Sequence, residues 1–426
     1  MKMLFYIKQA WRMMLANKLF SAIYICGTAL AIATTTLFAL IYYVKVAPIY
    51  PEFNRMKTYY LRYIENGEKG SPRKNVNNPS YPLVRDHLRK LKSASIVCAE
   101  TSGWDDYVQL PGDDREIEVD LKLTDPEFFK LYEYDFLEGR PFTAEEFDGG
   151  VLTGAISDRL AMDMFGTDTG VVGRTFSLNY QEYRVCGVFR EGSQLLPDSY
   201  AQVILPLTTE EDYDEEWGPF VGGVSVTFVS DDGKALKEEV DEIARKFNSS
   251  NPDYEVGFLD LPRSHIVNVF NSGIHQDEFV PIRSVVKKNL LILLVLLLIP
   301  ALNLSGLISS RMDMRSSEIG IRRSFGGTRF QLLKQVLWEN LVLTISGGVV
   351  GLVIVWLCII FSSGQLLTLL DSNNFNAVVS INLTPEILYA PAIFIVVFLL
   401  CVVLNILSAL VPAWFSLRKP VISNIE

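Results

Sequence analysis

The chain has 426 residues, of which 49% are hydrophobic, and its formal net charge is −10. The acidic charge is concentrated between residues 45 and 283, where 43 Asp and Glu stand against 25 Lys and Arg, and this argues against nucleic acid as a partner. An ordinary soluble protein is excluded by four long stretches without any charged residue, each longer than the ~20 residues that a helix needs to cross a bilayer: residues 19–44, 289–310, 340–370 and 387–417.

A short basic segment at residues 1–18 opens the chain and is predicted to form its own helix. Its apolar side chains recur at helical spacing, while Lys8 and Arg12 lie one turn apart on another side. This pattern is typical of an amphipathic helix on the cytoplasmic face of a membrane, and the alternative is a plain extension of the first span. Residues 19–44 form that first span, which is too long for the apolar core of a cleavable signal peptide.

Residues 45–286 are predicted to form one large extracytoplasmic domain with two lobes. Strand, helix and strand patterns follow one another near both of its ends, which indicates a split lobe next to the membrane built from residues 45–100 and 208–286. Residues 101–207 contain short strand-like runs and turn signals and are assigned to a second, more distal lobe. The fold class is therefore an α-helical membrane protein with four transmembrane helices and an inserted α+β domain of two lobes.

Little in this domain indicates an enzyme or a metal site. Its three histidines include His265 and His275, which lie near Asp277 and Glu278, but this spacing matches no standard metal motif. The histidines are expected to be solvated surface residues, and Cys98 and Cys186 are expected to be free thiols. We therefore expect no catalytic residue, no metal and no cofactor in this chain.

Three further spans are assigned to residues 287–310, 330–361 and 387–415. Lys and Arg are frequent in the N-terminal segment, in the loop at residues 311–329 and in the tail at residues 416–426, whereas the outer loop at residues 362–386 has none. Short loops rich in Lys and Arg remain in the cytoplasm, so both termini are predicted to be cytoplasmic.

The third span contains a Gly-x-x-x-Gly pattern at Gly347 and Gly351. Glycines at this spacing let two membrane helices approach closely, so both positions are predicted to pack against another helix. The alternative is that glycine is simply frequent in spans.

The loop at residues 311–329 is predicted to contain a short amphipathic helix parallel to the membrane. Ile321 and Phe325 share one helical face, and Glu318 precedes Arg322 by four residues, the favoured order for an ion pair. Gly326 and Gly327 end this helix, and Thr328 with Gln331 forms a capping box for the next one. The alternative is an ordinary positively charged cytoplasmic loop.

This loop also carries a family signature. The run EIGIRRSFGGTRFQLLKQVLWENL at residues 318–341 resembles the signature of FtsX-like permeases, the membrane subunits of MacB-type ABC transporters, although Ser324 and Gly327 stand where alanine is more usual. The runs DPEFFKLYEYDFLEGRPFTAEEF, ISDRLAMDMFG, VVGRTFSLN and YRVCGVFRE are similar to the periplasmic core domain of MacB, in the same order.

The resemblance implies a mechanism with separate partners. Two permease chains, alike or different, would pair with two ABC ATPase subunits that carry the ATP and Mg, because this chain has no GxxxxGK[ST] phosphate loop. The loop would dock on the ATPase as a coupling helix, through the matching positions Arg315, Glu318, Ile321, Arg322, Arg323 and Phe325. The movement would pass to the extracytoplasmic lobes by mechanotransmission.

Such a complex would reside in the inner (cytoplasmic) membrane, among its lipids, and export a drug, a peptide or another periplasmic cargo, with a periplasmic adaptor and an outer-membrane channel as further partners. Two alternatives stay open: an FtsX-like signal relay that activates a cell-wall hydrolase, and a lipoprotein-release permease.

Overall fold

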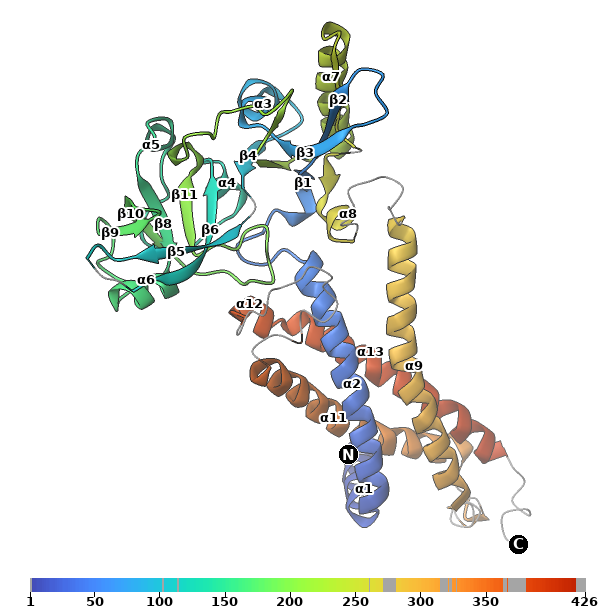
Figure 1. Ribbon diagram of the computed structural model, residues 1–426. Coiled ribbons are helices and arrows are strands. Elements are labelled where there is room, and N and C mark those ends of the chain that lie inside the picture. The colour runs from blue at the N-terminus through green and yellow to red at the C-terminus, as the bar shows by residue number, and fades with distance from the viewer. Residues whose placement is uncertain are drawn as a thin grey trace. The chain divides into compact units, whose positions relative to one another are not determined.

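The chain divides into two compact units, which Figure 1 shows in a computed structural model of the protein. The helical unit consists of Met1–Tyr43 and Arg283–Glu426, and the sheet unit consists of Val44–Ile282. The structure describes residues 2–101, 103–112, 115–259, 261–270, 281–314, 321, 324–326, 328–362, 366 and 381–418.

Long helices build the helical unit: α1 (Lys2–Ala16), α2 (Lys18–Val46), α9 (Ile282–Met314), α11 (Arg329–Phe361) and α13 (Pro391–Arg418), with the short α12 (Pro385–Leu388). Among the described residues, three helices are long and apolar enough to cross a membrane: Lys18–Val46, Arg329–Phe361 and Pro385–Leu410. The predicted second span lies within α9, a helix of 33 residues whose side chains lie partly outside the described set. The total of four spans therefore stays a prediction.

Helix α11 lies at the centre of the helical unit, where it packs against α1 and α13. The chain turns at Asn17, so α1 is separate from α2, and its place at the membrane surface stays a prediction. The hydroxyls of Tyr24 and Thr344 pair at 3.2 Å in the core. The apolar side chains of one buried cluster come from α2, α11 and α13: Tyr24, Leu332, Leu333, Val336, Leu343, Ala409 and Ala413.

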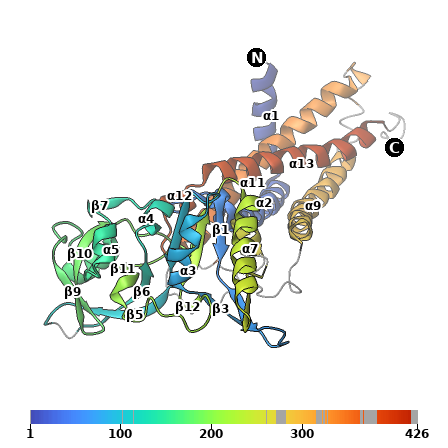
Figure 2. The ribbon, with the colours of Figure 1, turned by 90° about the horizontal axis from the view of Figure 1, so that it is seen from above.

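One part of the sheet unit is a closed barrel of six strands. The strands are β5 (Trp104–Gln109), β6 (Ile117–Thr124), β8 (Thr153–Ser157), β9 (Thr175–Leu178), β10 (Gln181–Phe189) and β11 (Val203–Pro206). They follow the order β11-β8-β10-β9-β5-β6, and the barrel closes because β11 pairs with β6 as well as with β8. Figure 2 shows these strands gathered at one end of the sheet unit. We call this part the barrel lobe; its strands fall within residues 101–207.

Three helices and a further strand complete the barrel lobe. Strand β7 (Phe136–Gly139) pairs with β10, and the short helices are α4 (Phe128–Leu131), α5 (Ala144–Asp148) and α6 (Asp158–Phe165). Thr143 and Glu146 form a capping box that begins α5. The hairpin between β9 and β10 turns at Asn179 and Tyr180, which both have positive φ, as a tight two-residue turn requires.

A second part, which we call the open-sheet lobe, continues from β6. It contains β4 (Ile96–Glu100), β13 (Ser225–Val229), β1 (Thr58–Leu61) and the two-residue edge strand β15 (Arg263–Ser264), in this order. The helices are α3 (Tyr81–Asp86), α7 (Gly233–Ser250) and α8 (His265–Phe270), with single turns η1 (Arg55–Lys57), η2 (Leu88–Lys90) and η3 (Leu207–Thr209) along the chain. Asp232 caps α7, which buries Leu236 and Val240 on one face.

A small second sheet accounts for the rest of the open-sheet lobe, in the order β12-β3-β2-β14. Its strands are β2 (Ile64–Glu68), β3 (Asn75–Pro79), β12 (Val221–Gly222) and β14 (Tyr254–Gly257). The strand pattern after α7 therefore belongs to this second sheet, because β14 pairs with the β2–β3 hairpin, and β15 takes the edge of the main sheet instead.

Candidate functional site

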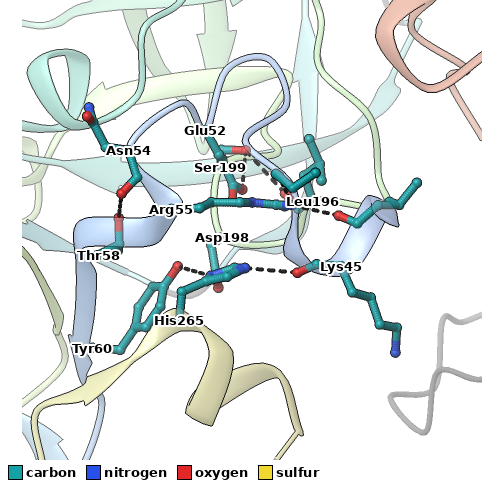
Figure 3. Close-up of polar contacts among 12 residues, drawn as sticks. Lys45, Glu52, Asn54, Arg55, Thr58, Tyr60, Leu196, Asp198, Ser199 and His265 are labelled. Atoms are coloured by element: carbon teal, nitrogen blue, oxygen red, sulfur yellow. Dashed lines mark hydrogen bonds and ion pairs between the residues drawn. The ribbon is translucent and has the colours of Figure 1, made fainter. Parts of the chain in front are cut away.

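A buried polar cluster surrounds the C-terminal end of α2, within the sheet unit (Figure 3). The last carbonyls of a helix have no partner inside the helix, and positive charge is favourable beside them. Here the Arg55 guanidinium Nη1 donates to the carbonyl oxygens of Val44, at 2.6 Å, and of Ala47, at 2.9 Å. The imidazole Nε2 of His265 lies 2.9 Å from the carbonyl oxygen of Lys45. Two side chains therefore bind three carbonyls at one helix end.

The two contacts of His265 determine its tautomer. A carbonyl oxygen only accepts, so Nε2 carries the hydrogen, and Nδ1 accepts from the Tyr60 hydroxyl at 2.9 Å. Burial, together with the charge of Arg55, lowers the pKa of His265 and keeps the ring neutral. The expectation that His265 is a solvated surface residue is wrong, because only 3% of its surface is exposed. His275, Asp277 and Glu278 lie outside the described residues.

Glu52 completes the cluster by holding Arg55 on one side and the barrel lobe on the other. Its Oε2 pairs with Arg55 Nε at 2.7 Å, and its Oε1 accepts from the Ser199 hydroxyl at 2.7 Å. Burial alone would lower the pKa of Arg55, but the charge and hydrogen bond of Glu52, together with Tyr60 and Asp198, raise it overall. We call Glu52, Arg55, Tyr60, Ser199 and His265 the helix-end cluster.

The residues directly after α2 make further contacts with the barrel lobe. The Tyr50 hydroxyl donates to the Arg190 carbonyl at 2.6 Å, and the Arg190 guanidinium stacks 3.7 Å from the centre of the Tyr50 ring. The Asn54 amide donates to the Leu131 carbonyl at 3.3 Å. Residues assigned from the sequence to the more distal lobe therefore bind the segment that leaves α2 directly.

Further charged side chains, some half-buried and some buried, join the two lobes. Arg62 pairs with Asp198, and Lys122 Nζ donates to the Pro197 carbonyl at 3.1 Å. Lys122 Nζ also lies 3.6 Å from Glu100 Oε2, an atom that accepts no hydrogen bond from any described residue. Burial raises the pKa of Glu100 to about 7, although Lys122 opposes this shift.

The loop between α9 and α11 exposes two large apolar side chains. Ile321 is 57% exposed and Phe325 is 87% exposed, and the backbone N–H of Phe325 donates to the Ile321 carbonyl at 3.1 Å, as in a helical turn. Gly326 follows with φ +89°, and the predicted capping box of Thr328 and Gln331 is confirmed at the start of α11. The other positions assigned to this site lie outside the described residues: Arg315, Glu318, Arg322 and Arg323.

Gly347 and Gly351 lie on the face of α11 that contacts α2. A Cβ atom on Gly351 would come within 2.5 Å of the Ala29 carbonyl oxygen, and one on Gly347 within 2.8 Å of Thr28 Cβ. Only glycine permits this approach, so both residues lie at a close contact between two helices.

Two protein-family models match the chain and together span most of it. The MacB-like periplasmic core domain matches residues 21–246, which is more than half of the chain, and the FtsX-like permease C-terminal region matches residues 290–421.

Curated relatives are ABC transporter proteins. The uncharacterized ABC transporter permease YknZ of Bacillus subtilis is 27% identical over 216 residues, which cover 50% of each chain. The macrolide export ATP-binding/permease protein MacB of Escherichia coli is 20% identical over 354 residues, which cover 81% of this chain and 51% of the relative. This chain thus spans about half the length of the curated relatives it matches.

Solved structures give weaker likenesses. The extracellular domain of the noncanonic ABC-type transporter YknZ from Gram-positive bacteria matches 46% of this chain at 20% identity, with all of that domain covered and a TM-score of 0.33. The periplasmic region of MacB from Actinobacillus actinomycetemcomitans matches 48% of this chain at 15% identity, with 89% of that region covered and a TM-score of 0.35. On the family matches, this chain belongs to the ABC transporter permeases that join a MacB-like periplasmic core domain to an FtsX-like permease region.

Proposed function

We propose that this chain is the membrane subunit of a MacB/FtsX-type ABC transporter and converts ATP hydrolysis on a separate ATPase into movement of the sheet unit. The observation that carries this proposal is the exposure of Ile321 and Phe325 on one turn between α9 and α11. Large apolar side chains this exposed on one turn of the chain are suited to a groove on another protein.

The sequence around that turn supplies the charges that such an interface needs. Glu318, Arg322 and Arg323 lie close to the two apolar residues in the sequence, and paired charges at an interface fix its register. The sequence contains no phosphate-loop motif, and we assign the ATP site to a separate ATPase subunit. A second permease chain would complete the complex.

Placement of the loop in the cytoplasm and of the sheet unit on the opposite side follows from the positive charge beside the spans. We assign the protein to the cytoplasmic membrane, with both termini inside. The sheet unit then handles cargo outside the cytoplasm, and export of a drug, a peptide or another periplasmic molecule is the role that the MacB relatives favour.

The test is copurification of the ATPase subunit with full-length variants. Phe325→Glu and Glu318→Lys should each lose the ATPase while the membrane fold remains intact, because each places a wrong charge in the interface. Trp217→Glu is the matched control, since Trp217 is a large exposed side chain of the sheet unit. Normal ATPase capture by both loop variants would contradict the proposal.

The same pull-down separates the possible outputs. An adaptor and an outer-membrane channel among the captured proteins would support export. A cell-wall hydrolase would replace export by a signal relay, and lipid-modified proteins would replace it by lipoprotein release.

A further inference from the structure

The end of α2 is bound more tightly than a helix end requires. Water or a glycine turn satisfies the last carbonyls of most helices, whereas here a buried guanidinium and a buried imidazole bind those of Val44, Lys45 and Ala47. Arg55 and Glu52 are both almost completely buried. A buried ion pair adds little net stability compared with apolar packing, so a gain in stability does not account for this arrangement.

What the helix-end cluster does provide is a connection among segments that are far apart in the sequence. His265 opens α8, Tyr60 lies on β1 of the open-sheet lobe, and Ser199 lies in the loop before β11 of the barrel lobe. Figure 3 shows these side chains converging on the end of α2 and on the residues that follow it. The Ser199 carbonyl also accepts from the Tyr134 hydroxyl, which adds a second attachment inside the barrel lobe.

Each member of the cluster uses its polar atoms on another member or on the helix end. Glu52 uses one oxygen for Arg55 and the other for Ser199, and His265 uses one ring nitrogen for Lys45 and the other for Tyr60. Loss of one member therefore leaves a buried polar group unpaired on its neighbour, so neighbouring contacts in the cluster stabilise one another.

We propose that Glu52, Arg55, Tyr60, Ser199 and His265 are positioning residues that join the end of α2 to both lobes, so that a displacement of this helix moves the barrel lobe and the open-sheet lobe together. This inference rests on the proposed function, in which the ATPase subunit is the source of the displacement. Helix α2 runs without a break from Lys18 to Val46, and a continuous helix transmits a displacement along its length.

The main test uses the full chain with its ATPase subunit in lipid nanodiscs and measures amide hydrogen exchange with and without ATP and vanadate. In the wild type, trapping the ATPase should change exchange in both lobes. In Arg55→Met and His265→Ala the ATPase should still copurify, but the ATP-dependent change should be lost in both lobes. His265→Gln keeps a donor toward the Lys45 carbonyl and should restore the response, which a general loss of stability would not allow.

Ser199→Ala provides a milder variant that separates the lobes. It removes the bond to Glu52 and a longer one, at 3.4 Å, to the Leu196 carbonyl within the same loop, so the ATP response of the barrel lobe should fall while that of the open-sheet lobe remains. Arg140→Met is the matched control, because Arg140 forms an exposed ion pair with Glu146 in the barrel lobe. A wild-type response in folded Arg55→Met and His265→Ala would overturn the inference.

A second measurement needs no ATPase and keeps the two proposals distinguishable. In the full chain alone, Ser199→Ala and His265→Ala should each speed amide exchange at residues 44–47 by roughly tenfold or more, because a buried hydrogen bond to a charged or coupled group contributes at least that factor to local opening. Unchanged exchange at residues 44–47 would exclude the connection itself. If amide exchange at residues 44–47 changes as expected but no ATPase is captured, the proposed function alone would be rejected.

Discussion

Ser199 and Glu52 lie 147 positions apart in the sequence, yet the hydroxyl of Ser199 donates to a Glu52 carboxylate oxygen at 2.7 Å, with both side chains buried. This bond joins the segment that leaves α2 to the barrel lobe. Four predictions follow from this bond, from two titrating groups near it and from one helix contact.

Ser199→Ala should lower the free energy of unfolding of the sheet unit by about 2 kcal/mol, because a buried hydrogen bond to a charged group is lost and Glu52 is left without that donor. Denaturant-dependent hydrogen exchange of the full chain measures this change. Ser249→Ala is the control, since the Ser249 hydroxyl donates to the Lys246 carbonyl at an exposed helix end. Equal effects of the two substitutions would contradict the prediction.

Acid should weaken the sheet unit through His265. Its pKa in the folded protein lies below the ordinary value of 6.5, so the unfolded chain binds the proton more tightly. The stabilising contribution of the neutral ring is complete above pH 6.5 and is lost as the pH falls below it. His265→Gln should reduce the loss of unfolding free energy between pH 7.5 and 5, and His87→Gln at an exposed position controls for the substitution itself. An identical pH profile for wild type and His265→Gln would refute this assignment.

Glu100 should weaken the sheet unit as the pH rises, which is opposite to the effect of His265. Its pKa rises from 4.5 to about 7 on folding, so the folded protein binds the proton more tightly, and this stabilisation is present below pH 4.5 and lost as the pH rises through 7. Glu100→Gln keeps an acceptor for Thr227 and carries no charge. At about 1.4 kcal/mol per pKa unit, its stability relative to wild type should therefore increase by on the order of 2–3 kcal/mol between pH 4.5 and 8.

Glu215→Gln changes an exposed carboxylate in the same way and serves as the control for that titration. Thermal unfolding is measured at each pH, with hydrogen exchange of the sheet unit as the readout. This gives the stability of each variant relative to wild type. A constant difference between Glu100→Gln and wild type across this range would show that Glu100 does not change protonation on folding.

Gly351→Ala should disturb the contact between α2 and α11. The added methyl group would come within 2.5 Å of the Ala29 carbonyl oxygen, and overpacking of this kind costs about 1–3 kcal/mol. The detergent-solubilised chain should unfold at a lower temperature. Gly306→Ala is the control, because nothing lies within 4 Å of a Cβ atom at that position of α9. Equal unfolding temperatures for the two variants would argue against close packing at Gly351.

Local sequence signals predicted several parts of the structure correctly. Thr328 and Gln331 form a capping box because both partners lie within one turn, so their spacing alone reveals the contact. Residue type and order along the chain also identified the family.

The helix-end cluster could not be predicted in this way. The spacing of Glu52 and Arg55 allows a local ion pair, but Ser199 and His265 join it only through the tertiary fold. A single histidine or serine in a sequence carries no periodic signal, so His265 was expected at the surface. Strand β15 was missed for a similar reason, since two residues are too few to show alternation.

The closed ring of the barrel lobe has a practical use. Sliding any of its six strands would break two ladders at once, so the ring resists shear and a change at its rim has little effect on the opposite side. The turn between β9 and β10 lies on this rim, and Tyr180 there is fully exposed. A fluorophore or an epitope inserted between Asn179 and Tyr180 would report where the barrel lobe travels during ATP turnover without loosening the ring that carries it.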